Sequence, residues 1–258
     1  MTRVLLTNDD GVLAPGIALL ERIATALFDE VWTVAPELDR SGVGHALTLS
    51  QPLRIREVAE RRYAVDGNPA DCVVCAVRSV MPEPPDLVLS GINLGQNIAD
   101  DVHYSGTIGG AMEGCFMGIR SIAVSQAYRW DGGRVPFWET SETHLPDLLR
   151  SLVDLDLPDG TFLNVNMPAV EPDAMRGVRV CHQGRVKHDM HTEERQDGRG
   201  KPYHWLRFGR GAPAAQPGSD IAALKDGFAS VTPLGTDLSN RDAFATVADR
   251  LGAEASRG

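Results

Sequence analysis

Two adjacent aspartates near the start of the chain are the first residues whose types and spacing could support metal chemistry. Asp9 and Asp10 follow a short apolar run, Val4 to Leu6, that predicts a buried strand. Neighbouring carboxylates repel one another unless a positive charge lies between them, and hard divalent cations take carboxylate oxygens as ligands. Because open α/β sheets bind ligands at the carboxyl ends of their strands, a metal site is one interpretation. A polar turn closed by Gly11 is the other.

Further polar residues follow later predicted elements. Asn93 and Asn97 come after a predicted buried strand at 86–90, so their amide groups should lie at the same sheet edge. Ser105 begins a predicted helix that runs to about Gly118. A helix N-terminus presents free backbone N–H groups that can bind an anion, and simple helix capping is the alternative.

The elements that must position these residues alternate between strands and helices. Amphipathic or capped patterns predict helices at about 15–28, 69–79, 105–118 and 141–153. Apolar runs predict strands at 4–6, 31–35, 86–90, 122–125 and 162–166, with shorter ones at 47–49, 53–55 and 63–65. This alternation predicts an α/β fold, with a Rossmann-like, doubly wound, mostly parallel sheet flanked by helices.

The pattern changes near residue 180. We expect residues 1–180 to form the Rossmann-like core and 181–258 to form a C-terminal extension that is not an independent domain. Within the extension, 182–216 is rich in Arg, His and Gly and predicts a hairpin arm, and 219–234 returns to globular patterning with a strand. A last helix carries four apolar residues on one face: Phe244, Val247, Ala248 and Leu251.

Composition limits the partners and the compartment. The formal net charge of −10 over 258 residues argues against binding to nucleic acid polymers or anionic membranes. No run of about 18 apolar residues predicts a membrane span. The first residues do not resemble a signal peptide, so we expect a cytoplasmic protein with reduced cysteines. Cys72 and Cys75 have metal-site spacing but lie in an apolar helical run, which favours a buried helix face.

Four segments, in this order along the chain, resemble the survival protein SurE family. They are Thr7-Asn8-Asp9-Asp10-Gly11, Arg40-Ser41 with Gly44-His45, Ser90-Gly91-Ile92-Asn93 with Asn97, and Tyr104-Ser105-Gly106-Thr107 with Glu113-Gly114. Weaker matches occur at 67–73 and, far downstream, at Asp220, 223–224 and 230–234, so the resemblance spans almost the whole chain. Two departures concern loop shape and substrate preference: Ala99 stands where the family usually has Gly, and Leu94 where a polar or basic residue is common.

The resemblance implies a metal-dependent phosphomonoesterase that acts on nucleoside 5′- and 3′-monophosphates, and members of the family can also shorten polyphosphate. It implies one divalent metal ion per subunit, held by Asp9, Asp10, Ser41 and Asn93, with Asn8 acting beside the two aspartates in catalysis. It places four residues around the substrate phosphate: Asn97, Ser105, Gly106 and Thr107. It also implies a homodimer or homotetramer assembled through exchanged C-terminal segments.

The chemistry of these residues agrees with that function. Two carboxylates, one amide oxygen and one hydroxyl form an all-oxygen donor set, which suits Mg²⁺, Mn²⁺ or Ca²⁺. A cation there would polarise a phosphoryl oxygen and acidify a water that attacks phosphorus. His45 and His103 are candidate proton donors to the leaving group, because histidine titrates near neutrality. Each is as readily explained as an ordinary loop histidine, so the general acid stays open.

Three rival functions are weighed against this one. A zinc deacetylase would need a histidine before the aspartate pair and a glutamate where Gly11 stands, and a haloacid-dehalogenase phosphatase would need an Asp-x-Asp spacing. Both fail on these residues. A non-catalytic nucleotide-binding sensor on the same fold stays as the alternative, because a fold does not determine a function.

Overall fold

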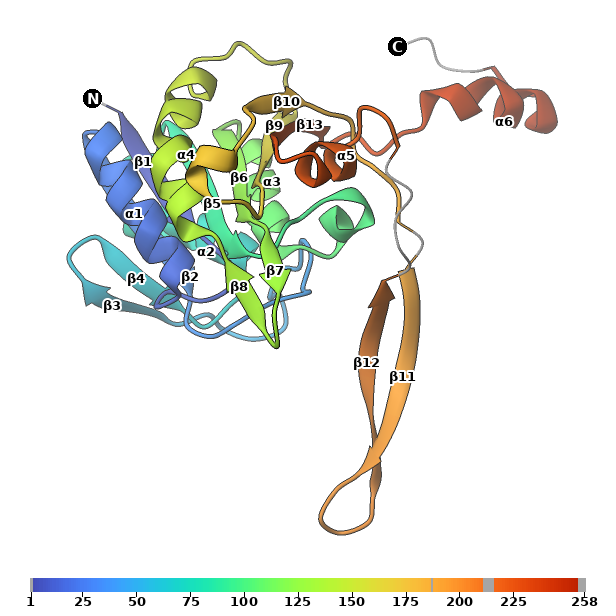
Figure 1. The fold of residues 1–258 in the computed structure, drawn as a ribbon, viewed down its shortest axis with the longest axis horizontal. Coiled ribbons are helices and arrows are strands. Elements are labelled where there is room, and N and C mark those ends of the chain that lie inside the picture. Colours follow the sequence, from blue (N-terminus) through green and yellow to red (C-terminus); the bar gives the residue numbers. More distant parts are fainter. Residues whose placement is uncertain (1, 187, 211–215, 255–258) are drawn as a thin grey trace.

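The central sheet of the computed structural model contains nine strands among the described residues, which are 2–186, 188–210 and 216–254. Their spatial order is β10-β13-β9-β6-β5-β1-β2-β4-β3 (Figure 1). The strands are β1 (Arg3–Thr7), β2 (Glu30–Pro36), β3 (Ile55–Ala59), β4 (Arg62–Val65), β5 (Leu87–Leu94), β6 (Arg120–Gln126), β9 (Thr161–Met167), β10 (Val178–Val180) and β13 (Ala229–Gly235).

Most of the sheet is parallel, as the sequence predicts. The pairs β1–β2, β1–β5, β5–β6 and β6–β9 are all parallel, whereas β3 runs antiparallel to β4 and β13 antiparallel to β9. The chain leaves β1 toward β2 on one side and later returns to β5 on the other side. The carboxyl ends of β1 and β5 therefore form a topological switch point, where α/β sheets bind their ligands.

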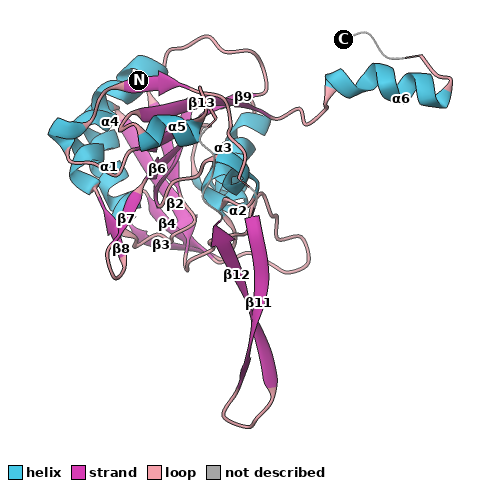
Figure 2. Ribbon diagram, turned by 45° about the vertical axis from the view of Figure 1, so that its right-hand side comes forward, coloured by secondary structure: helices cyan, strands magenta, loops and turns pink. Residues whose placement is uncertain are grey.

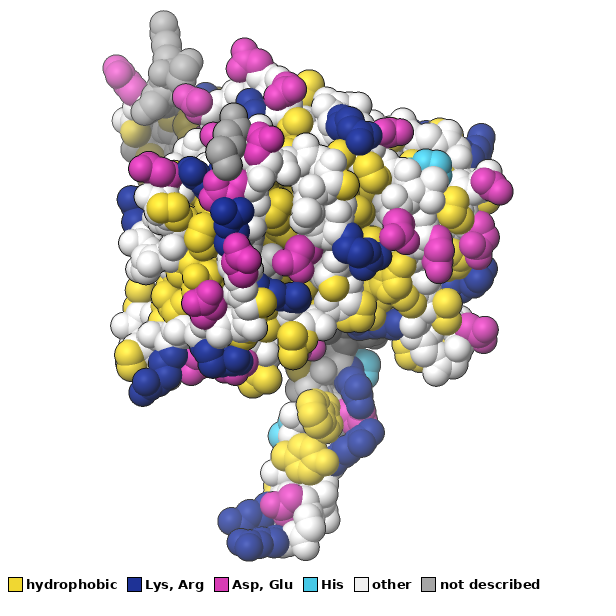
Figure 3. All heavy atoms as spheres, turned by 90° about the vertical axis from the view of Figure 1, so that its left-hand side faces the viewer, with side chains coloured by type: hydrophobic (Ala, Val, Ile, Leu, Met, Phe, Trp, Pro, Cys, Tyr) yellow, Lys and Arg dark blue, Asp and Glu magenta, His cyan; other side chains and the backbone are white. Residues whose placement is uncertain are grey.

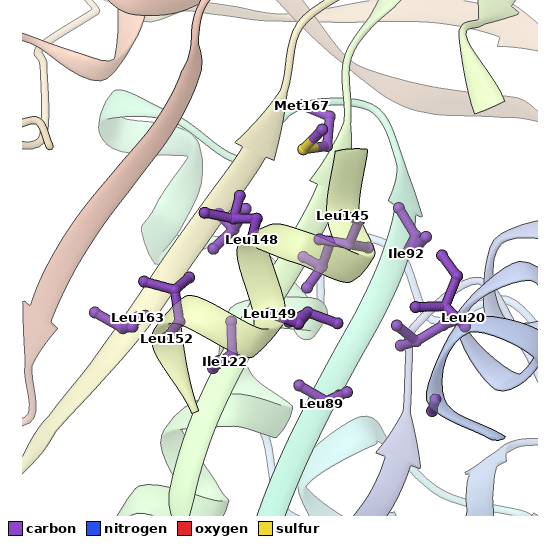
Figure 4. Close-up of a cluster of buried hydrophobic side chains, with 14 of the residues drawn as sticks. Leu20, Leu89, Ile92, Ile122, Leu145, Leu148, Leu149, Leu152, Leu163 and Met167 are labelled. Atoms are coloured by element: carbon purple, nitrogen blue, oxygen red, sulfur yellow. The ribbon is translucent and has the colours of Figure 1, made fainter. Parts of the chain in front are cut away.

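Helices cover both faces of the sheet. On one face, α1 (Pro15–Leu27) and α4 (Trp138–Leu152) pack over β1, β5, β6 and β9 through a buried cluster that includes Leu20, Leu89, Ile122 and Leu149 (Figure 4). On the other face lie α2 (Pro69–Cys75) and α3 (Gly106–Phe116), which contact each other. The predicted alternation of strands and helices is thus confirmed.

Three predicted strands differ from the structure, and the helix predicted at 141–153 begins earlier, at Trp138. Residues 47–49 do not form a strand, because Thr48 donates both its backbone N–H and its hydroxyl to the carboxylate of Asp71 instead (2.8 and 2.6 Å). Only the last residue of the predicted strand 53–55 is in β3. The strand expected to end at residue 90 continues to Leu94, with an irregularity in its pairing to β6 between Ser90 and Asn93.

Two segments of the C-terminal part extend away from the sheet (Figures 1 and 2). One is the antiparallel hairpin of β11 (His188–Gln196) and β12 (Pro202–Arg210), which confirms the predicted hairpin. Residues 187 and 211–215 of the predicted arm lie outside the described residues. The other segment is α6 (Phe244–Leu251), the predicted last helix.

These two segments carry exposed apolar side chains, whereas the residues between them return to the sheet. The hairpin exposes Met190, Tyr203, Trp205 and Leu206, and hydrophobic atoms are visible along it in Figure 3. The helix α6 exposes Phe244, Val247 and Leu251. Between them, α5 (Asp220–Lys225) is followed by β13, which lies inside the central sheet between β9 and β10. In the part of the chain that the structure describes, no helix is long and apolar enough to cross a membrane.

Candidate active site

A cavity of about 480 Å³ lies at the edge of the sheet where β1, β5 and β6 end. Six residues singled out from the sequence line it: Asp9, Asp10, Ser41, Asn93, Asn97 and Ser105. The rest of its lining comprises Gly42, Leu94, Gly95, Gln96, Asp101, Tyr104, Tyr128 and Arg134. Residues from five separate stretches of sequence therefore meet at one site, near the edge where the parallel strands end.

Asp9 is held by the first turn of α3. The Thr107 hydroxyl donates a hydrogen bond to Oδ1 of Asp9 at 2.5 Å. Gly106 packs directly against the same aspartate, because a Cβ added to Gly106 would lie 2.8 Å from Asp9 Cβ. Burial raises the pKa of Asp9 from 3.8 to about 6, the Thr107 hydrogen bond lowers it, and the charge of Asp10 adds to the increase. The first turn of α3 therefore fixes the position of the Asp9 carboxylate through a hydrogen bond and direct packing.

Asp10 faces the cavity from the next position. Its Oδ2 accepts a hydrogen bond from the Leu94 backbone N–H at 3.1 Å, which joins the end of β5 to the aspartate pair. Burial raises the pKa of Asp10, the Leu94 N–H lowers it, the charge of Asp39 raises it and the charge of Arg134 lowers it. Arg134 is exposed and is the only Lys or Arg among the described residues of the lining.

Ser41 reaches the cavity on the loop after β2. The Arg40 backbone N–H donates to the Asp9 carbonyl at 2.7 Å, so this loop is attached to the backbone of the aspartate pair. The Ser41 hydroxyl donates to Oδ1 of Asp39 at 2.6 Å, and this orients its oxygen. Asn93 donates from its Nδ2 to the Gly95 carbonyl at 2.7 Å. Its Oδ1 is then the amide atom suited to bind a cation.

Asn8 does not line the cavity. Its side chain is fully buried, and its Nδ2 donates to the Gly11 carbonyl at 2.9 Å, so Asn8 shapes the turn that carries the aspartates. Its Oδ1 has no hydrogen-bond partner among the described residues. The catalytic role predicted for Asn8 stays a prediction, and its contacts make it a support of the turn.

Asn97 is anchored beneath the cavity by a buried polar network. Its backbone N–H donates to Oδ1 of Asn166 at 2.8 Å, and its carbonyl accepts from Nδ2 of Asn164 at 2.8 Å. Its side chain donates to the Ser125 hydroxyl at 2.9 Å. We did not predict Asn164 and Asn166 as functional residues. The signal was present, because two asparagines inside an otherwise apolar strand must find buried hydrogen-bond partners.

The other predicted phosphate contacts take two different positions. Ser105 lines the cavity and also caps α3, since its hydroxyl accepts the Ile108 backbone N–H at 3.2 Å. The capping interpretation is therefore confirmed, and Ser105 still borders the cavity. Gly106 and Thr107 are buried behind Asp9 and do not line the cavity. Their observed contacts position the aspartate.

Neither candidate proton donor lines the cavity. The His45 Nε2 lies 2.7 Å from Oε2 of Glu113, and its ring stacks on Phe116 with a centroid distance of 5.5 Å. His103 is exposed and lies 3.4 Å, Nε2 to Nε2, from Gln183. The general acid stays unassigned. The contacts of His45 attach the loop of Ser41 to α3.

Sequence reasoning missed the small hairpin beside the cavity. It consists of β7 (Tyr128–Trp130) and β8 (Arg134–Pro136), and the Arg134 guanidinium lies over the Tyr128 ring at 5.2 Å. The Asp-Gly-Gly sequence at 131–133 between two apolar or aromatic stretches is a hairpin signal that could have found it. This hairpin supplies the cavity with an aromatic ring and a cation.

The donor set at this edge fits a hard divalent cation. Its atoms are carboxylate, amide and hydroxyl oxygens, which Mg²⁺, Mn²⁺ and Ca²⁺ prefer. No Lys or Arg forms a salt bridge with Asp9 within the described ranges, so a nearby cation would offset the cost of its buried charge. The described residues contain no cluster of three His, Cys, Asp or Glu. Cys72 and Cys75 are buried and unpaired on the α2 helix, as predicted for a buried helix face.

Comparisons with known proteins agree on one family. The model of the family described as Survival protein SurE matches residues 4–190. A protein of Brucella anthropi named 5′-nucleotidase SurE is 54% identical over 252 residues, which is 97% of each chain. One of the same name from Chelativorans sp. is 54% identical over 250 residues, covering 96% of this chain and 98% of its own. The crystal structure of the SurE protein from Aquifex aeolicus aligns with a TM-score of 0.82 at 37% identity, over 96% of this chain and 99% of that one.

Proposed function

This chain belongs to the survival protein SurE family and is a 5′-nucleotidase, and we propose that it hydrolyses nucleoside 5′-monophosphates with one divalent metal ion per subunit. The observation that carries the proposal is the joining of Asp9 to the N-terminus of α3 through Thr107. This contact places a carboxylate pair beside a helix end that favours anions. This combination suits a phosphomonoester, because its phosphoryl group carries negative charge that a carboxylate pair alone would repel.

The proposed metal ligands are Asp9, Asp10, Ser41 and Asn93, and Mg²⁺, Mn²⁺ and Ca²⁺ all suit their oxygen donors. A divalent cation there would withdraw charge from the phosphoryl group and make the attacking water more acidic. The chain supplies the orientation of the site. Thr107 and the Leu94 N–H hold the two carboxylates in place, and Asp39 orients the Ser41 hydroxyl.

Two kinds of lining residue are proposed to bind the substrate. Ser105 and Asn97 are the proposed phosphate contacts, and both line the cavity. Tyr104 and Tyr128 line it as well and offer aromatic rings to a nucleoside. Because the proposed phosphate contacts recognise only the phosphoryl group, we extend the proposal to nucleoside 3′-monophosphates and to terminal phosphates of polyphosphate.

The alternative of a non-catalytic nucleotide-binding sensor makes a different prediction. A sensor needs groups that hold an anion. Two adjacent carboxylates, of which Asp9 is buried and Asp10 half-buried, would repel an anion unless a metal ion lies between them. The raised pKa of Asp9 and Asp10 shows that burial opposes their ionisation. Carboxylates with a raised pKa are typical of enzyme active sites, so this placement favours an enzyme over a sensor.

The decisive experiment is release of inorganic phosphate from AMP with Mg²⁺, Mn²⁺ or Ca²⁺, and with EDTA. We expect turnover with at least one metal and loss of turnover with EDTA. Asp10→Asn should lower kcat by at least about 100-fold, because it removes a metal-binding charge. Asp147→Asn is the matched control, since this aspartate is exposed on α4 and its carboxylate pairs with Arg150 of the same helix. Binding of AMP without release under every metal would favour the sensor.

We also propose that the subunits form a homodimer or homotetramer through the C-terminal segments, in the cytoplasm. The hairpin β11–β12 and α6 expose apolar side chains that a partner subunit would bury, and contiguous exposed apolar surface marks interaction sites. The four cysteines are unpaired, as expected in a reducing compartment. Light scattering tests the assembly: a mass of one chain, 27.9 kDa, would contradict it.

A further inference from the structure

Asp220 is a fully buried carboxylate that lies outside the cavity and joins three parts of the chain. It is the first residue of α5, and its Oδ1 accepts the backbone N–H groups of Ile221 and Gly184 at 2.8 and 2.9 Å. Its Oδ2 accepts the backbone N–H of Ala99 at 2.9 Å, across 121 positions of sequence. A buried carboxylate that accepts three hydrogen bonds fixes the groups that surround it.

Ala99 has a backbone conformation that contacts with other residues must stabilise. Its φ angle is +51°, in the left-handed region that favours glycine, and its side chain is fully buried. Such a conformation persists only when neighbouring structure holds it. Here both sides of the residue are held, because Asp220 accepts its N–H and Gln183 donates from Nε2 to its carbonyl at 2.8 Å.

The position of Ala99 links this clamp to the cavity. It lies two residues after Asn97 and starts the short 3₁₀ helix at 99–103, which leads directly to Ser105. We call residues 97–105 the cavity loop. Its first end is also held by the asparagine network described above, and its last end by the start of α3. The clamp at Ala99 is a third attachment, two residues from Asn97, and it holds the one loop residue with a left-handed backbone.

The same clamp reaches the base of the projecting hairpin. Gln183 and Gly184 precede β11, and the Val186 backbone N–H donates to Oδ2 of Asp100 at 2.9 Å. The segment 183–186 is therefore bonded both to Asp220 and to two consecutive residues of the cavity loop. A displacement of the hairpin base would be transmitted to the loop through these bonds.

We propose that Asp220 is a positioning residue that sets the path of the cavity loop, and with it the positions of Asn97 and Ser105, while attaching that loop to the hairpin base. This inference rests on the proposed function, because Asn97 and Ser105 are there the contacts to the substrate phosphate. Asp220 itself touches neither substrate nor metal. It acts through the peptide groups of Ala99.

The test compares Asp220→Asn with wild type in the full chain, at a temperature where circular dichroism shows both folded. An asparagine keeps the shape but loses one acceptor oxygen, so amide hydrogen exchange at 98–105 should accelerate at least about tenfold, while β1 and β5 stay protected. The KM for AMP and the inhibition constant of inorganic phosphate should both rise about tenfold, with a smaller change in kcat. Asp226→Asn is the matched control, since this exposed residue on the same segment pairs with Arg179 and should change neither measurement.

Gln183→Ala is the second variant, because it removes the bond to the Ala99 carbonyl, together with the 3.4 Å contact to His103, and leaves the Asp220 carboxylate intact. It should change exchange and phosphate inhibition in the same direction by a smaller factor. Unchanged exchange in folded Asp220→Asn, or faster exchange with unchanged KM and phosphate inhibition, would overturn the proposal, as would failure of both variants to fold. Wild-type protein that releases no phosphate from AMP would instead refute the proposed function, and the exchange measurement and phosphate binding would still decide the role of Asp220.

Discussion

The hydroxyl of Thr107 donates a hydrogen bond to Oδ1 of Asp9, and 98 positions of sequence separate the two residues. This bond connects the first turn of α3 to the residue that follows β1. The proposed phosphate site and the proposed metal site therefore cannot move independently. In a phosphatase, this bond would hold the phosphoryl group and the cation at a fixed distance from each other during the reaction. Such positioning of reacting groups increases the rate.

Thr107→Val tests this relation. The substitution keeps the buried shape of the side chain and removes its hydroxyl, so the Asp9 carboxylate loses a hydrogen bond that stabilises its charged form. A bond to a charged group contributes about 1.5–3 kcal/mol, so metal affinity measured by calorimetry should fall roughly 10- to 100-fold. Thr107→Ser, which retains the hydroxyl, should remain close to wild type. Equal affinity of the valine and serine variants would contradict the role assigned to this bond.

Gly106→Ala tests the close approach of α3 to the aspartate. An added Cβ would lie 2.8 Å from Asp9 Cβ and 3.1 Å from Pro69 Cγ, so α3 or Asp9 must shift. Because a displacement of about 1 Å can cost about 100-fold in rate, we expect kcat for AMP to fall by that order while the chain stays folded. Gly133→Ala is the control, since nothing lies within 4 Å of its added Cβ. Full activity of the Gly106 variant would show that the contact can relax.

Metal binding should depend on pH through Asp9. Its folded pKa is raised from 3.8 to about 6, so without metal its stabilising contribution is fully present below 3.8 and is lost as the pH rises through about 6. Metal binds the deprotonated form and should therefore offset this loss above pH 6. At a free metal concentration of 100 Kd, the gain in unfolding free energy is about 2.7 kcal/mol.

The measurement for this prediction is the melting temperature with and without Mn²⁺ from pH 5 to pH 8. We expect the Mn²⁺-induced rise to diminish as the pH falls through about 6. Asp9→Asn removes the group that titrates near 6, so any residual rise in this variant should depend less steeply on pH, with Asp10 as the remaining titrating ligand. A rise that is equally large at pH 5 and pH 8 in wild type would argue against Asp9 as a ligand.

His45→Ala distinguishes proton donation from loop attachment. General acid catalysis contributes about 100- to 10,000-fold, so loss of a true proton donor should lower kcat by at least that order. The 2.7 Å contact with Glu113 and the position outside the cavity lead us to expect a fall below about tenfold. His144→Ala, on α4, serves as the control. A fall of 100-fold with loss of one limb of the pH–rate profile would restore the acid role.

Arg134→Ala should weaken substrate binding without disabling the chemistry. Arg134 is the only Lys or Arg of the described lining, and its guanidinium lies over the Tyr128 ring. An exposed cation–π contact contributes about 0.5–1 kcal/mol, so KM for AMP should rise a few-fold with kcat nearly unchanged. Arg129→Ala is matched to it, since Arg129 lies on the same hairpin over Phe137 and does not line the cavity. An equal rise in KM for both variants would contradict a specific role of Arg134 in substrate binding.

The sequence predicted the parts of this protein that depend on local patterns. The apolar run before Asp9 and the apolar face of α1 each indicate their element directly, and the confirmed family membership follows from short motifs in fixed order. Three-dimensional contacts could not be predicted in the same way. The segment 47–49 alternates like a strand, yet the carboxylate of Asp71 binds it instead.

In the candidate site, too, residue types could be predicted from the sequence, whereas contacts between distant residues could not. Residues with distinctive chemistry, such as Asp10 and Asn93, could be found from type and position, and both line the cavity. Positioning roles could not, because Thr107, Gly106 and Asp220 act through partners that are distant in sequence. His45 has chemistry suited to acid catalysis, but type and position did not predict its contact with Glu113, and its role as a proton donor stays a prediction.

The place of β13 in the sheet has a consequence for biosynthesis. β13 pairs with β9 on one side and β10 on the other, so both strands lack this neighbour until residues 229–235 have left the ribosome. During translation, the nascent chain therefore presents an unpaired edge of β9, and such edges readily bind other extended chains. Premature termination between 181 and 228 should yield products that aggregate or are degraded, even though every proposed metal ligand has already been made.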